Sequence, residues 1–273
     1  MSSSIQVRWA FATCLIASGH LTHAQATEVT AASGQVTHQV FLEGGSQTLA
    51  FSPNMLAFMD VGKTQVTPYA GSEVGILKDE DGFYTQISVQ NPLTSIQVNE
   101  NGTLIENIRS TGGMTLTSPT LKGVSTSGSL TLGDWNISTA DRTVSALVIG
   151  ANGVNTSPSQ AIWQATGMQA SLTQTGVWDG QGDNALYFYD YTVTLTGLTL
   201  TDIGRSTFAQ ALGLQTLGQA ALGTVTDSGT LTTKMTFLAP SHFALAVPEP
   251  GTWALMGLGL LGLAVSARRQ PRH

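Results

Sequence analysis

The stretch from Ala185 to Leu200 constrains the fold most, because its second half alternates strictly between apolar and hydroxyl-bearing residues. Tyr191, Val193 and Leu195 occupy one parity, and threonines occupy the other. Successive side chains of a β-strand point to opposite faces of the sheet, so a period of two is typical of a strand with one buried face. Such a strand belongs in a sandwich or a barrel, where that face is covered.

Shorter strand candidates recur along the rest of the chain, roughly every 8 to 12 residues, which is the spacing of sandwiches and barrels. Turn residues separate them, including Gly44-Gly45, Ser52-Pro53-Asn54 and Asn91-Pro92. We therefore predict an all-β protein with an antiparallel β-sandwich or barrel-like body. The candidates include residues 36–42, 47–51, 55–60, 64–70, 83–90, 143–149, 161–165, 169–173 and 229–238.

One segment interrupts the strand pattern with helical spacing. Phe208, Ala211 and Leu212 share a face at i, i+3 and i+4, and Asp202 or Ser206 can cap the start. This predicts one short helix near 203–213. A weaker helical turn is indicated at residues 217–222.

Residues 1–26 are typical of a secretory signal peptide. Arg8 precedes an apolar run, and Ala24 and Ala26 form an A-x-A cleavage site before Thr27. The one cysteine, Cys14, lies inside this segment and would leave with it. The mature chain would then hold its fold without disulfides, and it would have no thiolate for zinc, iron–sulfur or nucleophilic chemistry.

The chain ends with three elements in a fixed order. Pro248, Glu249 and Pro250 come first, an uncharged run follows, and arginines come last. As a helix the run reaches the lower limit of a bilayer span. A buried core helix would have a polar face, and this run has none. Tryptophan prefers the membrane interface, and arginines after a span stay in the cytoplasm by the positive-inside rule. Together with the run they predict a C-terminal transmembrane helix. The predicted anchor is Trp253, Leu255, Leu258, Leu260, Leu261, Leu263 and Val265, and the basic stop is Arg268, Arg269 and Arg272.

This order of motif, apolar run and basic end resembles the PEP-CTERM sorting tail of Gram-negative, biofilm-forming bacteria. The resemblance covers residues 248–273 only. It implies that Pro248, Glu249 and Pro250 are recognised by an exosortase, a membrane transpeptidase-like enzyme. It further implies cleavage near the motif, so that the protein is exported, transiently anchored in the inner membrane, and then placed at the cell surface or outside the cell.

These features divide the chain into a signal peptide (1–26), a β-rich extracytoplasmic domain (27–240), a spacer (241–247) and the sorting and anchor segment (248–273). Residues 27–247 contain seven Lys/Arg and sixteen Asp/Glu, a net charge of −9 against −6 for the whole chain. An acidic body argues against nucleic acid and anionic membrane surfaces as partners.

The sequence offers little catalytic chemistry. Beyond the signal peptide the histidines are His38, His242 and His273, and no pair has the spacing of metal ligands or fits a Ser-His-Asp arrangement. We therefore expect no enzyme activity and no cofactor. Paired carboxylates from distant strands remain compatible with glycoside hydrolysis.

Two acidic loops carry the hard oxygen ligands that calcium prefers. One is Asp79-Glu80-Asp81-Gly82; the other contains Asp179, Asp183 and Asn184. Neither loop has a full ligand set, and hairpin turn chemistry accounts for both without an ion. Calcium therefore stays an alternative, with no metal as the expectation.

We expect an exported surface or extracellular-matrix protein that is processed by an exosortase and associated with biofilm exopolysaccharide. The alternative is a secreted polysaccharide-binding module or glycoside hydrolase. Exposed aromatic rings beside carboxylates on one sheet face would favour the alternative, whereas buried rings under a Thr-rich surface would favour the structural role. Trp135, Trp163 and Trp178 discriminate between them.

Overall fold

The computed structural model of the protein describes residues 29–32, 36–37, 40–99, 104–179, 185–240 and 243. The predicted signal peptide, sorting motif and transmembrane helix lie outside these residues. Within the described part of the chain, no helix has the length and apolar character needed to cross a membrane.

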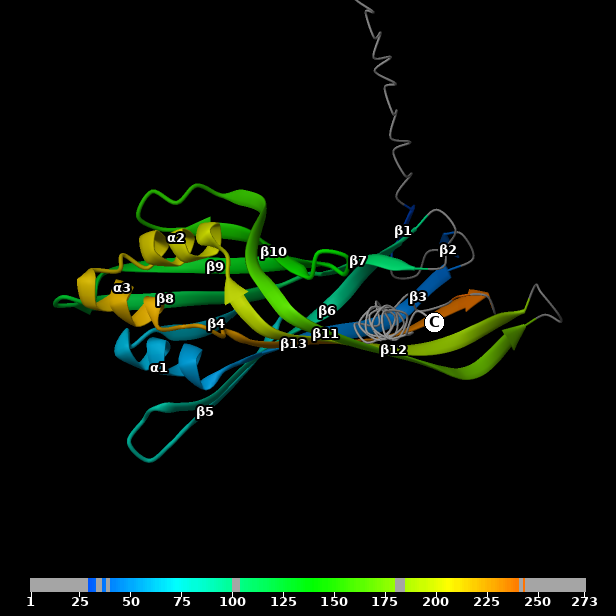
Figure 1. The fold of residues 1–273 in the computed structure, drawn as a ribbon, viewed down its shortest axis with the longest axis horizontal. Coiled ribbons are helices and arrows are strands. Elements are labelled where there is room, and N and C mark those ends of the chain that lie inside the picture. The colour runs from blue at the N-terminus through cyan, green and yellow to red at the C-terminus, as the bar shows by residue number, and fades with distance from the viewer. Residues whose placement is uncertain are drawn as a thin grey trace, which may run out of the picture.

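A single antiparallel sheet holds all thirteen strands of the described residues, which confirms the all-β prediction (Figure 1). The main path through the sheet runs β1-β6-β3-β13-β12-β11-β10-β9-β8-β4. The strands are β1 (Val29–Ala32), β2 (Val36–Thr37), β3 (Val40–Phe51), β4 (Gln65–Tyr69), β5 (Glu73–Lys78), β6 (Tyr84–Val98), β7 (Ile105–Ser110), β8 (Gly113–Leu121), β9 (Ser125–Ser138), β10 (Thr143–Gly150), β11 (Ser157–Asp179), β12 (Leu186–Leu200) and β13 (Gly229–Pro240).

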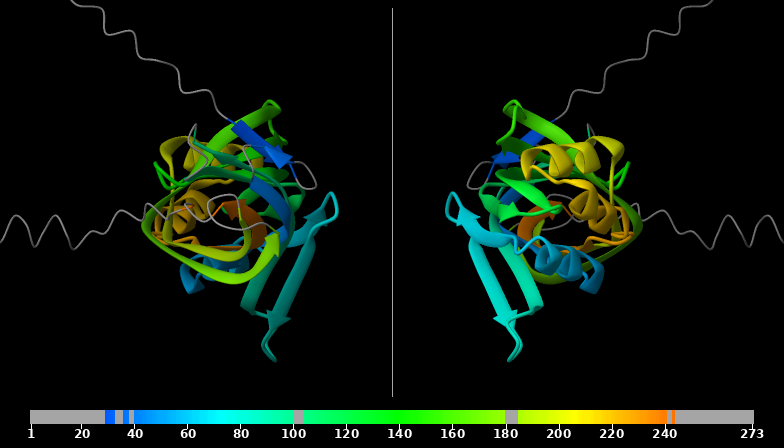
Figure 2. Two further views of the ribbon diagram at one scale, coloured as in Figure 1. Left: turned by 90° about the vertical axis from the view of Figure 1, so that its right-hand side faces the viewer. Right: turned by 90° about the vertical axis from the view of Figure 1, so that its left-hand side faces the viewer.

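Strand β7 closes this sheet into a ring, because it pairs with β6 on one side and with β9 on the other. Ile108 of β7 lies opposite both Ile96 and Ile137. The ring runs β6-β3-β13-β12-β11-β10-β9-β7, so the body has the barrel-like form of the two predicted. Beyond β7 the edges separate: β5 extends from β6, and β8 and β4 extend from β9. Figure 2 shows the β5–β6 hairpin projecting from the body.

The part of the chain that the structure describes has three helices, and they lie at one end of the long axis (Figure 1): α1 (Pro53–Val61), α2 (Asp202–Ala211) and α3 (Thr216–Gly223). Helix α2 confirms the helix expected near 203–213, and α3 covers the weaker helical turn. The prediction of only one short helix is wrong, because residues 55–60 form a helix rather than a strand. Ser52 caps α1 by accepting a hydrogen bond from the Met55 amide (3.2 Å), and Pro53 occupies its first turn. Ser-Pro-Asn therefore starts a helix here, as well as ending a strand.

Several strands are longer than their turn residues predict. Strand β3 continues through Gly44-Gly45, and β11 joins two predicted strands into one. At Gly45 the absence of a side chain lets β13 approach closely, since a Cβ atom there would lie 2.3 Å from the Lys234 carbonyl oxygen. Strand β6 likewise continues through Asn91-Pro92, where pairing with β3 and β5 gives way to pairing with β7 and β1. Glycine and proline in these strands mark close approach and exchange of partners.

The core fills the ring, and the parity predicted for β12 is confirmed. Tyr191, Val193 and Leu195 are all buried. At the helical end α2 packs against β9 and β11 and buries Phe208 completely. The sequence periodicity of two therefore describes the inner and outer faces of the ring.

Ser52 should contribute measurably to stability because its hydroxyl caps α1 and also donates to the Asp227 carbonyl, which leads into β13. We expect Ser52→Ala to lower the free energy of unfolding by about 1–2 kcal/mol. Urea unfolding of the body would measure this. Ser159→Ala is a matched control, because Ser159 is exposed on the surface. Equal stability of the two variants would contradict the role of the cap.

Candidate functional site

The residues predicted to carry sorting lie outside the described residues. These are the motif (Pro248, Glu249, Pro250), the anchor and arginines that follow, and the cleavage residues Ala24 and Ala26. Of the calcium candidates, Asp183 and Asn184 also lie outside. Asp179 is the last residue of β11, where its backbone pairs with Leu186. The described body therefore ends shortly before the sorting residues.

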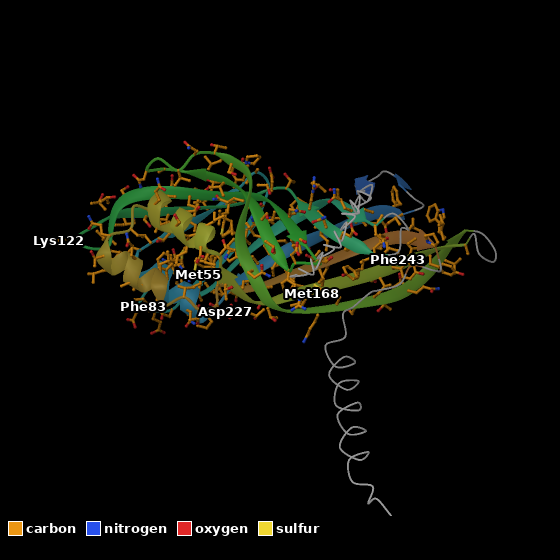
Figure 3. The ribbon with its side chains drawn as sticks, turned by 45° about the horizontal axis from the view of Figure 1, so that its top comes forward. Met55, Phe83, Lys122, Met168, Asp227 and Phe243 are labelled. Atoms are coloured by element: carbon orange, nitrogen blue, oxygen red, sulfur yellow. The ribbon has the colours of Figure 1, made fainter. Side chains whose placement is uncertain are left out.

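Phe243 is the last described residue, and it packs into an aromatic cluster at the end of the ring. Its ring lies 4.9 Å from that of Phe237 and 6.1 Å from that of Tyr189, measured between centroids. Its amide donates a hydrogen bond of 3.0 Å to the Pro240 carbonyl. Although Phe243 falls within the predicted spacer (241–247), its side chain is buried. Figure 3 places it far from Phe83 and Lys122 along the molecule.

Two tyrosines of β12 form the inner part of this aromatic cluster. Tyr189 stacks on Phe237 at 5.7 Å, and the Tyr191 ring meets Phe237 edge-on at 6.5 Å. Burial raises the pKa of Tyr191 to about 12. Burial, and secondarily the neighbouring Tyr187, also raise the pKa of Tyr189. Tyr189 and Tyr191 thus serve as packing inside the sheet.

The tryptophans divide into a buried pair and an exposed residue. Trp135 and Trp163 are buried and meet edge-to-face with centroids 6.4 Å apart. The Trp135 indole N–H donates to the Leu132 carbonyl at 3.2 Å. Trp178, near the end of β11, is 62% exposed and lies edge-to-face on Phe188 at 5.6 Å. Two of the three discriminating residues are therefore core residues.

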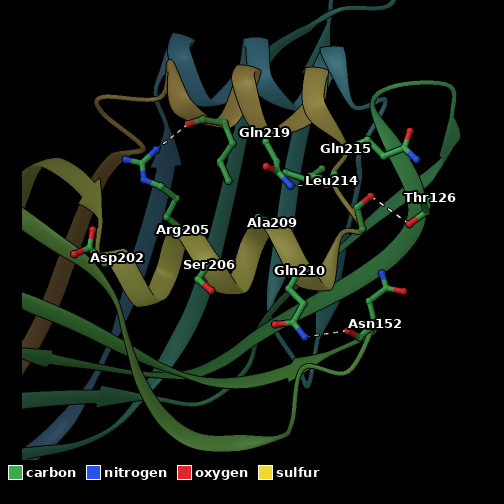
Figure 4. Close-up of a pocket in the computed structure, with 12 residues that line it drawn as sticks. Thr126, Asn152, Asp202, Arg205, Ser206, Ala209, Gln210, Leu214, Gln215 and Gln219 are labelled. Atoms are coloured by element: carbon green, nitrogen blue, oxygen red, sulfur yellow. Dashed lines mark hydrogen bonds between the residues drawn. The ribbon is translucent and has the colours of Figure 1, made fainter.

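An open groove of about 750 Å³ separates α2 from α3 (Figure 4). Most polar side chains that line it bind the backbone of neighbouring segments. Arg205 Nη1 donates to the Leu222 carbonyl (3.2 Å), and Gln219 Nε2 donates to the Leu214 carbonyl (3.0 Å). Gln210 Nε2 donates to the Asn152 carbonyl at 3.1 Å. Each of these side chains thus uses a donor to hold the backbone in place around the groove.

The outer face of β3, β13, β12 and β11 carries rows of hydroxyl and amide side chains, which we call the hydroxyl face. Opposite residues on paired strands share a face, so the register defines these rows. One row contains Gln169, Thr194, Thr232 and Thr48, and the next contains Ser171, Thr192, Lys234 and Ser46. Thr194 and Thr232 hydroxyls lie 3.5 Å apart. This face presents many weak hydrogen-bonding groups and few charges.

The acidic loop at Asp79–Gly82 forms the turn of the β5–β6 hairpin. Asp79 Oδ1 accepts hydrogen bonds from the amides of Asp81 (3.1 Å) and Phe83 (2.8 Å). Gly82 adopts φ +85°, a conformation that favours glycine. One carboxylate is thus used to stabilise the turn. Among the described residues, no group of three or more His, Cys, Asp or Glu side chains comes together as a metal site would require.

A buried polar row crosses the core, and nothing in the sequence pattern predicts it. Asn91, Gln47 and Thr233 lie opposite one another on β6, β3 and β13, and all three are fully buried. Gln47 accepts a hydrogen bond from the Ser110 hydroxyl of β7 at 2.8 Å. Polar residues that point into the ring follow the same period of two as those that point outward, so the sequence does not show which of them are buried. This row ties β7 to β3 from inside the ring.

Comparison with known proteins finds the model of the PEP-CTERM protein-sorting motif at residues 246–269. No curated protein and no solved structure matches the chain. The matched segment begins three residues after Phe243 and contains the predicted motif, anchor residues and first two arginines.

Tyr191 should make the body less stable at high pH. Its pKa is about 12 when folded and near 10 when unfolded, so between these values the unfolded chain releases a proton that the folded body retains. Stability is thus unaffected below about pH 10 and is lost as pH rises toward 12, by up to about 3 kcal/mol. Urea unfolding at a series of alkaline pH values would measure the loss. The variant Tyr191→Phe should show a shallower pH slope, and an unchanged slope would contradict the assignment.

Proposed function

We propose that this chain, which carries the PEP-CTERM protein-sorting motif at residues 246–269, is exported, processed by an exosortase, and serves as a structural component of the cell surface or extracellular matrix. In this proposal the exosortase cleaves the chain near Pro248–Pro250 and releases the β-rich body. The body then associates with exopolysaccharide through its hydroxyl face and performs no catalysis.

The sorting motif at residues 246–269 is the observation that carries this proposal. It directly follows the last described residue of the body, Phe243, so the body and the motif are joined by very little chain. A body that is already closed by β7 and β13 before the motif begins supports release as an intact unit. Export also agrees with a chain whose one cysteine lies in the predicted signal peptide.

The contacts of the polar groups support a structural role over a catalytic one. The groove between α2 and α3 is lined by Arg205, Gln210 and Gln219, and each of these donates to a backbone carbonyl. Side chains that hold the backbone in this way are less available to bind or activate a substrate. The buried positions of Trp135 and Trp163 also favour the structural role, because they withdraw two stacking platforms from solvent.

The hydroxyl face supports association with a polysaccharide. Threonine and serine hydroxyls donate and accept hydrogen bonds, as sugar hydroxyls do. Neighbouring strands lie about 4.8 Å apart, and alternate residues on a strand lie about 6.8 Å apart, so the groups repeat regularly. Each contact is weak, but many contacts to one polymer add up through high effective concentration. This suits retention in a matrix.

Replacing Glu249 should block processing. In cells that make an exosortase, we expect Glu249→Gln to leave the full-length chain in the inner membrane, because the variant removes the carboxylate from the recognition motif. Fractionation followed by detection of the body would show the chain move from the released to the membrane fraction. Glu43→Gln provides a matched control, since Glu43 is an exposed carboxylate on the body. Normal release of the Glu249 variant would refute the assigned role of the motif.

Removing hydroxyls from the hydroxyl face should weaken retention by exopolysaccharide. The variant with Thr192, Thr194 and Thr232 replaced by valine keeps shape and β-propensity but loses three hydroxyls. At roughly 0.5 kcal/mol for each hydrogen bond, binding should fall by about tenfold. Co-sedimentation of the released body with exopolysaccharide from the producing cells would measure it.

A matched control replaces Thr67, Thr117 and Thr120 by valine, because these threonines are exposed on β4 and β8. This variant should bind as strongly as the unchanged body. If both variants lose binding equally, or if neither does, the hydroxyl face is not the binding surface.

A further inference from the structure

The short connection between body and sorting motif limits where the body can lie before cleavage. Four residues, 244–247, separate Phe243 from Pro248. Even fully extended, this connection spans at most about 18 Å between the two Cα atoms. Phe243 is itself held by Phe237 and Tyr189, so it cannot lengthen the connection without leaving the core. The predicted anchor begins at Trp253, ten residues beyond Phe243, so the end of the ring that contains Phe243 stays within about 36 Å of the membrane interface while the anchor is inserted.

An apolar row crosses the outer face of the sheet at this same end. Leu238 of β13 lies opposite Phe188 of β12 and Phe41 of β3, so all three side chains share the outer face. Phe188 and Phe41 are half-buried and Leu238 is buried, so they form the base on which an exposed ring can pack. Trp178 of β11 packs on Phe188. We call these four residues the apolar row. Leu238 directly follows Phe237 in β13, and Phe188 directly precedes Tyr189 in β12. Phe237 and Tyr189 are the two residues that hold Phe243.

The row marks a sharp change in polarity along the outer face. The next row toward the middle of the sheet contains Asp190 and Thr236, joined by a hydrogen bond of 2.8 Å, and the hydroxyl face follows. Side chains are thus apolar at the end that carries the connection to the anchor and polar beyond it. Trp178 is the most exposed large apolar side chain of the row, and an indole is the ring that prefers the membrane interface.

We propose that the apolar row, through Trp178, contacts the lipid interface of the membrane while the chain is still anchored, and so holds the body upright over the sorting motif. The inference rests on the proposed function, because it requires an inserted C-terminal anchor. A zwitterionic lipid surface fits best, since the body is acidic overall and would be repelled by anionic lipid. Cleavage would then release the body from a surface that it contacts only weakly on its own.

Quenching by brominated lipid tests this contact. The chain without its signal peptide, with the sorting tail intact, is made in cells that lack an exosortase and reconstituted in phosphatidylcholine vesicles with brominated acyl chains. The variant Trp253→Phe removes the tail indole, so the remaining indoles are the buried Trp135 and Trp163 and the exposed Trp178. We expect brominated lipid to remove most of the emission of Trp178. The double variant W178F/W253F should lose this quenching.

A matched control moves the indole to the other end of the molecule. Phe83, 56% exposed on the β5–β6 hairpin, is nearly as accessible as Trp178 at 62%. In the W178F/W253F background, Phe83→Trp should escape quenching, because this hairpin lies far from Phe243 along the molecule (Figure 3). Quenching of the introduced indole as strong as that of Trp178 would overturn the proposed orientation.

Flotation of the vesicles separates failure of this inference from failure of the proposed function. If the chain does not float with the vesicles, the anchor itself fails and the proposed function falls with it. If the chain floats but Trp178 is not quenched by brominated lipid, the anchor holds and the lipid contact is refuted. In that case, protection of Trp178 from aqueous acrylamide would show that another segment of the chain or a second copy covers the row.

Discussion

The pairing of β7 with both β6 and β9 is the contact on which the rest of the structure depends. It converts a long curved sheet with two open edges into a ring whose inner face is enclosed, as Ile108 shows by lying opposite Ile96 and Ile137. Exposed edges invite pairing with other chains, so closure also limits such pairing. Ser110 of the same strand donates to Gln47 inside the core and ties β7 to β3 across the ring.

Closure gives the two parities of every ring strand different environments. On β12 the inward parity packs Tyr191, Val193 and Leu195, and the outward parity contributes threonines to the hydroxyl face. The same threonine pattern that marks the strand in the sequence thus supplies the surface proposed to bind exopolysaccharide. Fold and proposed function share one periodicity, because a one-sided sheet must bury one face and present the other to solvent.

The two ends of the ring serve different purposes. At one end α2 and α3 cover the core, and their polar side chains donate hydrogen bonds to backbone carbonyls. At the other end Phe243 enters the aromatic cluster of Tyr189 and Phe237, directly before the sorting motif. The chain therefore leaves the body from a firmly packed position, which places the apolar row beside the exit and makes orientation at the membrane a property of the folded body.

The sequence by itself determined the strand parity of β12, the helix near 203–213, and the sorting motif, because each is a local pattern of side chains. It misassigned residues 55–60 and the glycines at 44–45, since Ser-Pro can cap a helix and Gly45 can serve a close strand contact. Only the tertiary structure decided which polar residues are buried, as with Asn91, Gln47 and Thr233, and where the chain leaves the body. Those outcomes depend on pairing between strands far apart in the sequence, whose register no local pattern records.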